Sequence, residues 1–377
     1  MLAALSALAS QGIRPPPPKT CGSPGGPPIT ATRVRLRDGR YLAYKEHGVP
    51  RELAEHKIVF VHGADSRRHD AVIATVVSPA VLEKLKVYVL SFDKPGYGES
   101  DPDPKRTPKS LALDIEDLAD QLGLDTKFYV AAGEVAVHKY WPGYGPSHGP
   151  SADNAQALET DPARACLTSR LYTKPQKKNT IVTVTTAMEL AGAALTAPVI
   201  NYWWPGFPAN MSKEAYYLQP PQDQWALRVF HYAPWLTYWW NTQKWFAASS
   251  VVTRTPCILG RQDMEIIPKM MERRNDASRV IVRQQGEAES ILRELMVGFG
   301  SWEFDPMDIE NPFPNEEGVV HLWQGDDDRI VPVLLQRHIA QKLSWIQYHE
   351  VPGAGHFFPY ADGMGEAILK ALIAGQK

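Results

Sequence analysis

Short apolar runs alternate along this chain with longer segments in which apolar residues recur every three or four positions. The runs lie at 57–63, 87–93, 127–132, 190–200, 319–325 and 346–351. Apolar runs of this length, separated by segments with a helical period, are typical of parallel strands buried on both faces of a sheet. The pattern therefore predicts an α/β protein with a mostly parallel central sheet and flanking helices.

The intervening segments predict helices over 71–86, 108–124, 332–344 and 363–374. The second is the best defined, because Thr107 can cap it, Pro108 suits its first turn, and Leu111, Ile115, Leu118 and Leu122 fall on one face. Before the first strand, two alternating segments meet at Asp38-Gly39. This pair predicts a hairpin whose two turn positions both need positive φ.

Composition changes along the chain and indicates separate regions. Residues 1–30 read as a disordered tail and a Pro-rich linker, with the folded part starting near Ala31. Residues 31–202 and 316–377 form the predicted core, within which 133–190 lacks any sustained period and reads as an atypical, irregular insertion. Residues 203–315 predict a helical cap inserted between strands 6 and 7. This region holds most of the tryptophans, which we expect to pack in the cap or to contact a substrate (Trp203, Trp204, Trp225, Trp235, Trp239, Trp240, Trp245, Trp302).

The charge balance narrows the function classes. A net charge of -2 and a pI near 6.6 give no broad basic field for nucleic acid, so a small-molecule partner is favoured. Three scattered cysteines (Cys21, Cys166, Cys257) form no disulfide framework and no metal-ligand pair, which favours the cytoplasm. The apolar start, residues 1–13, is shorter than the roughly 20 residues that span a bilayer. Membrane association through it is the alternative, and no cofactor or metal is predicted.

Two loops that follow predicted strands carry candidate chemistry. Asp328 lies in "GDDDRIVP", and His356 follows 28 residues later in "GAGHFFP", after the next strand. Taken alone, the loop of Asp328 reads as an acidic turn, and His356 reads as a core histidine. Because parallel strands end at the same edge of a sheet, the two together are a candidate general base with its orienting acid. Gly63, in "FVHGADS", allows a sharp turn that aims amides at a bound oxygen, whereas "SFDKPGYGESD" reads mainly as a tight structural turn.

These motifs, in this order, resemble those of the α/β-hydrolase superfamily. With "NYWWPGFPAN", "PQDQWALR" and "WEFDPMDIENPFPN", the chain is similar to a plant esterase/lipase-like group within it, over about 30–132 and 190–375. The resemblance implies an α/β-hydrolase fold and a serine hydrolase of ester or similar acyl substrates. It also implies that Asp328 is the acid, that His356 is the base, and that the amide of Ala64, with Gly63, is the oxyanion donor.

The resemblance also implies a nucleophile on a G-x-S-x-G turn directly after the strand at 127–132, and the chain departs from the pattern there. It continues Gly133-Glu134-Val135-Ala136-Val137, which places Val135 at the nucleophile position, or Glu134 after a slip of one residue. A G-x-S-x-G does occur at 145–149, around Ser147. Its flanks fit poorly, since an elbow needs a strand before it and a helix after it, although Pro150 could start a helix.

Two functions remain open from the sequence. One is an active hydrolase that uses Ser147, His356 and Asp328. The other is a relative with a degenerate catalytic triad, either a non-catalytic ligand-binding protein or the product of an alternative splice that replaced the turn and its helix. Without an activated hydroxyl, a histidine and acid pair has no proton to take and catalysis fails.

Overall fold

The computed structural model describes residues 13–124, 127–133, 189–255, 259–273, 280–315 and 317–375. The apolar start before Ile13, and the positions of Glu134, Val135 and Ser147, lie outside the described residues. Of the region 133–190, only residue 133 at its start and residues 189 and 190 at its end are described.

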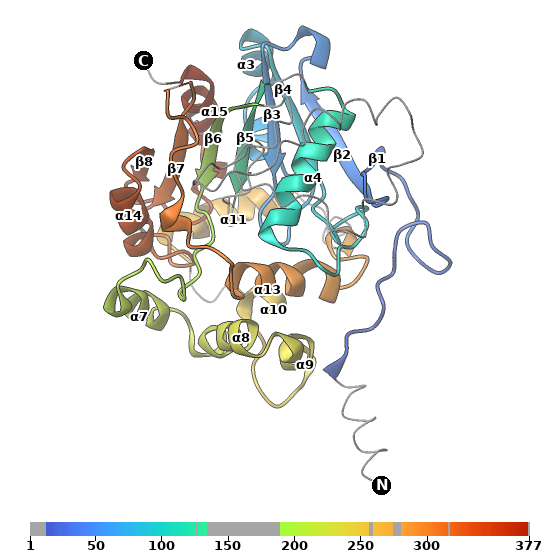
Figure 1. Cartoon of the computed structure of the whole chain (residues 1–377), viewed down its shortest axis with the longest axis vertical. Coiled ribbons are helices and arrows are strands. Elements are labelled where there is room, and N and C mark those ends of the chain that lie inside the picture. The colour runs from blue at the N-terminus through green and yellow to red at the C-terminus, as the bar shows by residue number, and fades with distance from the viewer. Residues whose placement is uncertain are drawn as a thin grey trace, which may run out of the picture.

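The described residues form one eight-stranded sheet in the order β1-β2-β4-β3-β5-β6-β7-β8 (Figure 1). The first two strands pair antiparallel, as do β2 and β4, and the remaining pairs are parallel. All six parallel strands fall on the predicted apolar runs. The strands are β1 Arg33–Arg35, β2 Tyr41–Gly48, β3 His56–Val61, β4 Val87–Phe92, β5 Lys127–Gly133, β6 Glu189–Thr196, β7 Val320–Gly325 and β8 Ile346–Val351.

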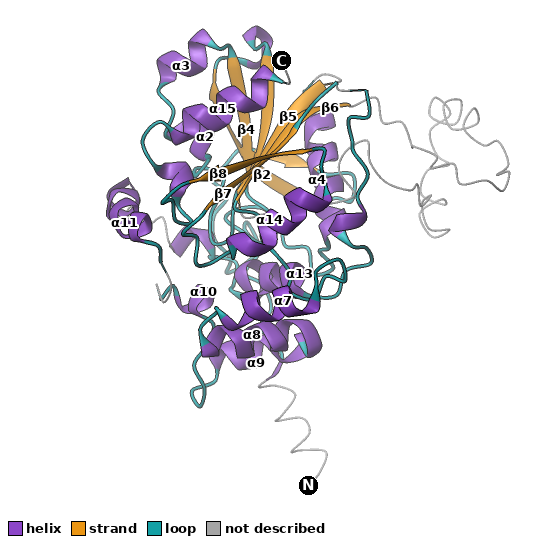
Figure 2. Ribbon diagram, turned by 90° about the vertical axis from the view of Figure 1, so that its left-hand side faces the viewer, coloured by secondary structure: helices purple, strands orange, loops and turns teal. Residues whose placement is uncertain are grey.

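Helices cover both faces of this sheet (Figure 2). Alternate residues of one strand serve the two faces: Val59 packs with α4, whereas Ile58 packs with α2, α3 and α15. On the α4 face, α14 lies over β7 and β8. In the described part of the core the helices are α2 Val72–Thr75, α3 Pro79–Lys84, α4 Pro108–Gln121, α14 Val333–Lys342 and α15 Met364–Ala374.

The helix at 108–124 forms as predicted. The Thr107 side chain accepts a hydrogen bond from the Ser110 amide, and the predicted apolar face packs into the core. The single helix expected over 71–86 is wrong, because two short helices occur there. Pro79, at the first turn of α3, cannot donate to the ladder of a helix that reaches it, so α2 ends before it.

Two other expectations for the N-terminal part also need correction. At the hairpin only Gly39 has positive φ (92°), and Asp38 does not, so the turn is not of the expected kind. The linker before Ala31 is bound to the core in its second half: the amides of Thr30 and Ala31 donate to the Glu99 carboxylate, and the thiol of Cys21 is buried.

The cap contains α7 Ala209–Tyr217, α8 Pro221–Tyr232, α9 Thr237–Thr242, α10 Ser250–Thr253, α11 Arg261–Arg273 and α13 Arg293–Phe299. In Figure 1 α7, α8, α9, α10 and α13 lie below the sheet, beyond the carboxyl ends of its parallel strands, whereas α11 lies level with the lower part of the strands. The hydrophobic core of this region mixes aliphatic residues with aromatic ones that include Tyr202, Trp204 and Phe230. The described residues also form the short 3-10 helices η1 Arg51–Leu53, η2 Pro234–Leu236, η4 Pro306–Asp308 and η5 Phe358–Tyr360, and a π-helical turn, η3 Ala288–Leu292, that runs directly into α13.

Candidate active site

Asp328 follows β7 and is fully buried, and each of its two oxygens accepts two hydrogen bonds. One oxygen takes the amides of Ile330 and Val331, both at 2.9 Å. The other takes the Gln324 side-chain amide at 2.9 Å and Nδ1 of His356 at 2.8 Å. Three of these four groups are N–H donors, so the Asp328 carboxyl group is the acceptor in each of those bonds.

The pairing of β7 with β8 explains how two residues so far apart in sequence meet. The strands are parallel, and Gly325 at the end of β7 is in register with Val351 at the end of β8. Both following loops therefore leave the sheet at one edge. The structure thus brings together Asp328 and His356 as their positions after successive strands predicted.

The hydrogen bond to Asp328 decides which nitrogen of His356 carries the proton. Because the carboxylate can only accept, Nδ1 must donate, and Nε2 then carries the lone pair of the neutral ring. The ring is buried (2% of its side chain is exposed), so rotation is restricted. A buried imidazole held in this tautomer can take a proton at Nε2, which is the chemistry of a general base.

The loop after β3 holds Gly63 and Ala64, and its shape is fixed by the ring of His62. That ring bonds the Gly63 carbonyl through Nδ1 at 2.8 Å and accepts the Lys94 amide at Nε2 at 2.9 Å. Burial and the Lys94 charge hold the pKa of His62 well below its usual range. His62 is therefore a neutral structural residue, and the oxyanion role of Ala64 and Gly63 remains a prediction.

The loop after β4 contains a second buried carboxyl group, Asp93. It accepts the amides of Arg68 at 2.7 Å and Glu99 at 3.0 Å, and it pairs with the Arg68 guanidinium. Gly98 has φ of +50°, and a Cβ there would lie 2.1 Å from an Asp93 oxygen. The loop is thus a tight structural turn, as its Gly-rich sequence indicated.

A buried ionic cluster that the sequence did not reveal joins this loop to the cap. Glu294 of α13 contacts the Lys94 ammonium at 2.7 Å and the Arg106 guanidinium at 2.6 Å. Burial alone would raise the pKa of Glu294, but the two positive charges outweigh it and lower that pKa to about 2. The partners lie about two hundred residues apart in sequence, with no motif to connect them.

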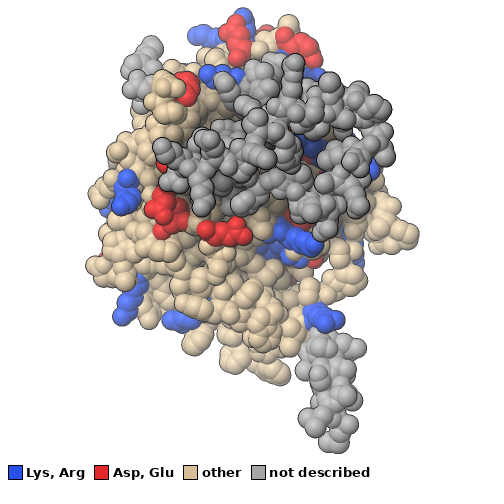
Figure 3. All heavy atoms as spheres, in the orientation of Figure 1, with Lys and Arg blue, Asp and Glu red and all other residues tan. Residues whose placement is uncertain are grey.

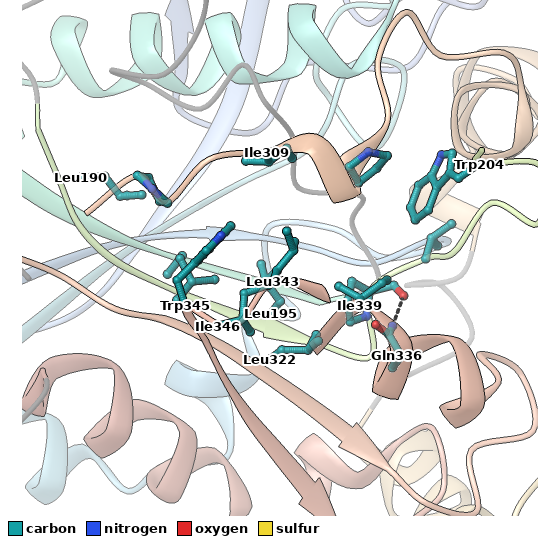
Figure 4. A pocket seen from close by; sticks show the side chains of 16 residues that line it. Leu190, Leu195, Trp204, Ile309, Leu322, Gln336, Ile339, Leu343, Trp345 and Ile346 are labelled. Carbon is teal, nitrogen blue, oxygen red and sulfur yellow. Dashed lines mark hydrogen bonds between the residues drawn. The ribbon is translucent and has the colours of Figure 1, made fainter. Parts of the chain in front are cut away.

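An apolar hollow of about 100 Å³ lies on the α4 face of the sheet, between β6, β7 and α14 (Figure 4). Among the described residues that line it, Gln336 carries a side-chain amide, which donates to the Pro198 carbonyl at 2.7 Å. Neither Asp328 nor His356 lines it. Its wall is mainly aliphatic, and Trp204 and Trp345 also line it.

The surface of the cap holds several of the remaining aromatic residues. Trp225, Trp235 and Trp245 are each more than half exposed. In Figure 3 the surface over the cap shows little charge, and elsewhere on that face acidic and basic side chains of the described residues stand in small groups of both signs. Within the described part of the chain, no helix is long and apolar enough to cross a membrane, and no group of three or more His, Cys, Asp or Glu could hold a metal.

Comparison with known proteins gives the fold. No protein-family model and no curated protein matches the chain. Among solved structures it is similar to MGS-M2, an alpha/beta hydrolase enzyme from a Medee basin deep-sea metagenome library, with 13% identity and a TM-score of 0.50 over 92% of this chain and 98% of that one. It is also similar to the enol-lactonase from Burkholderia xenovorans LB400, with 16% identity and a TM-score of 0.49 over 90% and 98%.

At these sequence identities the similarity shows the fold alone. The fold assignment rests on MGS-M2, because the enol-lactonase has the lower TM-score. The fold is that of the α/β-hydrolases, with a mostly parallel sheet flanked by helices. This confirms the fold expected from the motifs. The plant grouping and the degenerate triad stay predictions.

Proposed function

We propose that this protein hydrolyses esters or similar acyl compounds, with His356 as general base and Asp328 as the acid that orients it. The observation that carries the proposal is the buried 2.8 Å hydrogen bond from His356 Nδ1 to the Asp328 carboxylate, at the carboxyl edge of an α/β-hydrolase sheet. The partner would be a small, apolar or ester-containing molecule.

In this reaction Nε2 of His356 takes the proton of a nucleophilic hydroxyl as the hydroxyl oxygen attacks the acyl carbonyl carbon. Asp328 stabilises the imidazolium that forms, and the amides of Ala64 and Gly63 donate to the oxyanion. The imidazolium then returns the proton to the leaving alcohol. Water, deprotonated by the same nitrogen, releases the acid and restores the hydroxyl. Ser147 is the candidate for that hydroxyl.

Labelling with a fluorophosphonate, which reacts with activated serine hydroxyls, tests this proposal. We expect the full-length chain to be labelled, and His356→Ala and Ser147→Ala to abolish labelling. Labelling that survives Ser147→Ala would assign the nucleophile to another residue. A folded wild-type chain that takes no label would contradict the proposed activity.

A second function, ligand binding without turnover, is favoured by one observation. When the G-x-S-x-G pattern is aligned directly after β5, the chain has Val135 at the position where the nucleophilic hydroxyl is expected. In this case an acyl ligand should raise the melting temperature while no product forms. Ester hydrolysis that His356→Ala abolishes would exclude it. A peptide map of the natural protein across 128–192 tests whether that segment comes from an alternative splice.

The cytoplasm is the compartment that we propose, from the scattered cysteines. Burial and then the Glu99 charge raise the pKa of the Cys21 thiol to about 11, so this cysteine is held as an unreactive thiol. Recovery of the full-length chain from cells without detergent is the expected result. Recovery with membranes alone would favour the apolar N-terminal segment as an anchor.

A further inference from the structure

A carboxyl group from the cap holds the loop that carries His356. Asp263 lies in the first turn of α11 and is fully buried. One of its oxygens accepts the amide of His356 at 3.0 Å, and the other accepts the amide of Phe357 at 2.8 Å. The first oxygen also accepts the amide of Gly260 at 3.0 Å. Two of the three donors therefore belong to the histidine loop, and only the third belongs to the start of α11 itself.

The neighbouring residues of that turn extend the contact on both sides. Gln262 accepts the Gly355 amide at 3.2 Å, so three consecutive amides of the histidine loop bond to the first turn of α11. Asp327, next to the acid, accepts the Arg261 amide at 3.1 Å. The start of α11 thus joins the loop of the acid to the loop of the base.

The glycines in these loops fit the same arrangement. A Cβ on Gly355 would lie 2.3 Å from the carboxyl carbon of Asp263, closer than any real contact allows. A Cβ on Gly260 would lie 2.7 Å from the Asp327 carbonyl oxygen. The absence of a side chain at Gly355 allows the Asp263 carboxyl group to lie against the loop backbone, and its absence at Gly260 allows the start of α11 to approach the loop of Asp328.

We propose that Asp263 is the positioning residue for His356, and that it places the imidazole against Asp328 from the cap. The proposal builds on the proposed hydrolase function. The physical reason is that only two side-chain torsions separate the His356 backbone from its ring. Fixing the amides on both sides of its Cα therefore fixes where Cβ lies and limits Nδ1 to the few positions that the rotamers of these two torsions allow. An acid that only capped α11 would have no need of the two bonds to the histidine loop.

The test is the proton that His356 Nδ1 shares with Asp328, followed as a low-field resonance in protein labelled with ¹⁵N-histidine and assigned by its loss in His356→Gln. Asp263→Asn replaces one acceptor oxygen by an amide that cannot accept. We expect exchange of that proton with water to become at least about tenfold faster, because a charged acceptor of the loop is lost. Exchange at the wild-type rate in a folded Asp263→Asn would overturn the proposal.

Asp223→Asn is the matched control. Asp223 is another buried carboxyl group of the cap, and its hydrogen bonds go to Ser249 and Ser250, at the start of α10. Its substitution should lower stability while leaving the resonance and its exchange rate unchanged. An equal acceleration in both variants would mean that general loosening of the cap is the cause, and would also overturn the proposal.

If Asp263→Asn does not fold, the same exchange measurement on Gln262→Ala tests the proposal. It removes one neutral acceptor from a partly exposed position, so a smaller acceleration in the same direction supports the proposal and none overturns it. The resonance needs neither substrate nor nucleophile. Its response to Asp263→Asn in a chain that takes no fluorophosphonate would therefore support the positioning role while the proposed activity fails.

Discussion

Asp93 and Asp328 are two buried carboxyl groups in equivalent places, since each follows a parallel strand at the carboxyl edge of the sheet. The side chain of each has 0% exposure. Both accept two backbone amides from their own surroundings. They differ in the ionisable partner, which is the Arg68 guanidinium for Asp93 and the His356 imidazole for Asp328, and Asp328 also accepts the side-chain amide of Gln324.

The difference in donor separates structure from chemistry. A guanidinium keeps its proton at every relevant pH, so the Asp93 pair can hold a loop but cannot move a proton. Burial raises the pKa of Asp93 even though Arg68 opposes this, which shows how strongly that site excludes water. An imidazole exchanges its proton near neutral pH, so the Asp328 pair can do acid–base work.

The largest effect should follow Asp328→Asn. The amide nitrogen of asparagine cannot accept the His356 proton, so the ring is expected to turn to the wrong tautomer for a general base. We predict that the rate of fluorophosphonate labelling falls by about 10⁴-fold. Asp326→Asn, at an exposed acid two residues earlier, should leave the rate unchanged. Equal losses in the two variants would remove the distinction between these acids.

The next largest effect should follow Asp93→Asn, on stability. It leaves the buried Arg68 guanidinium with Glu99 as its remaining carboxylate, and we expect the free energy of unfolding to fall by about 3–5 kcal/mol. Urea unfolding measures this. Asp120→Asn, which breaks an exposed pair with Arg37, should cost about 1 kcal/mol or less. A similar cost for both variants would show that the ion pair of Asp93 is not structural.

A smaller effect concerns a pair of histidines on the face of the sheet opposite α4. His321 Nδ1 lies 2.9 Å from Nε2 of His349, whose ring stacks on Trp323. Burial, and then the proximity of His349, lower the pKa of His321 to about 4. Burial also lowers the pKa of His349. Among the described residues, neither ring contacts a carboxylate, whereas the ring of His356 does.

The sign of the resulting pH dependence follows from proton binding. Between about pH 4 and about pH 6.5, the unfolded chain binds a proton at His321 that the folded chain does not. Stability should therefore be fully present above about pH 6.5 and fall as the pH drops toward 4. Urea midpoints across this range measure it, and His321→Gln should flatten the slope. An unchanged slope would show that other groups cause it.

Much of the fold could be predicted from the sequence, and so could the acid and the base of the candidate site. The apolar runs locate the parallel strands because burial on both faces leaves a continuous signal, and the shared edge of such strands places Asp328 beside His356. The sequence also contains the signal for the break between α2 and α3, namely Pro79, although the apolar period over 71–86 obscured it.

Contacts between distant segments could not be predicted in this way. Asp263 resembles any acid in the first turn of an exposed helix, and only the packing of α11 on the histidine loop distinguishes it. Lys94 and Glu294 carry no local pattern that links them. The partner of a buried charge is a property of tertiary structure, which is also why Asp93 and Asp328 look alike in sequence.

The most direct measurement of the central claim is the tautomer of His356, read from the ¹⁵N shifts of its two ring nitrogens at neutral pH. We expect a proton on Nδ1, donated to Asp328, and a lone pair on Nε2. A neutral ring with its proton on Nε2 would exclude His356 as the general base, because that nitrogen could then take no proton from a nucleophile.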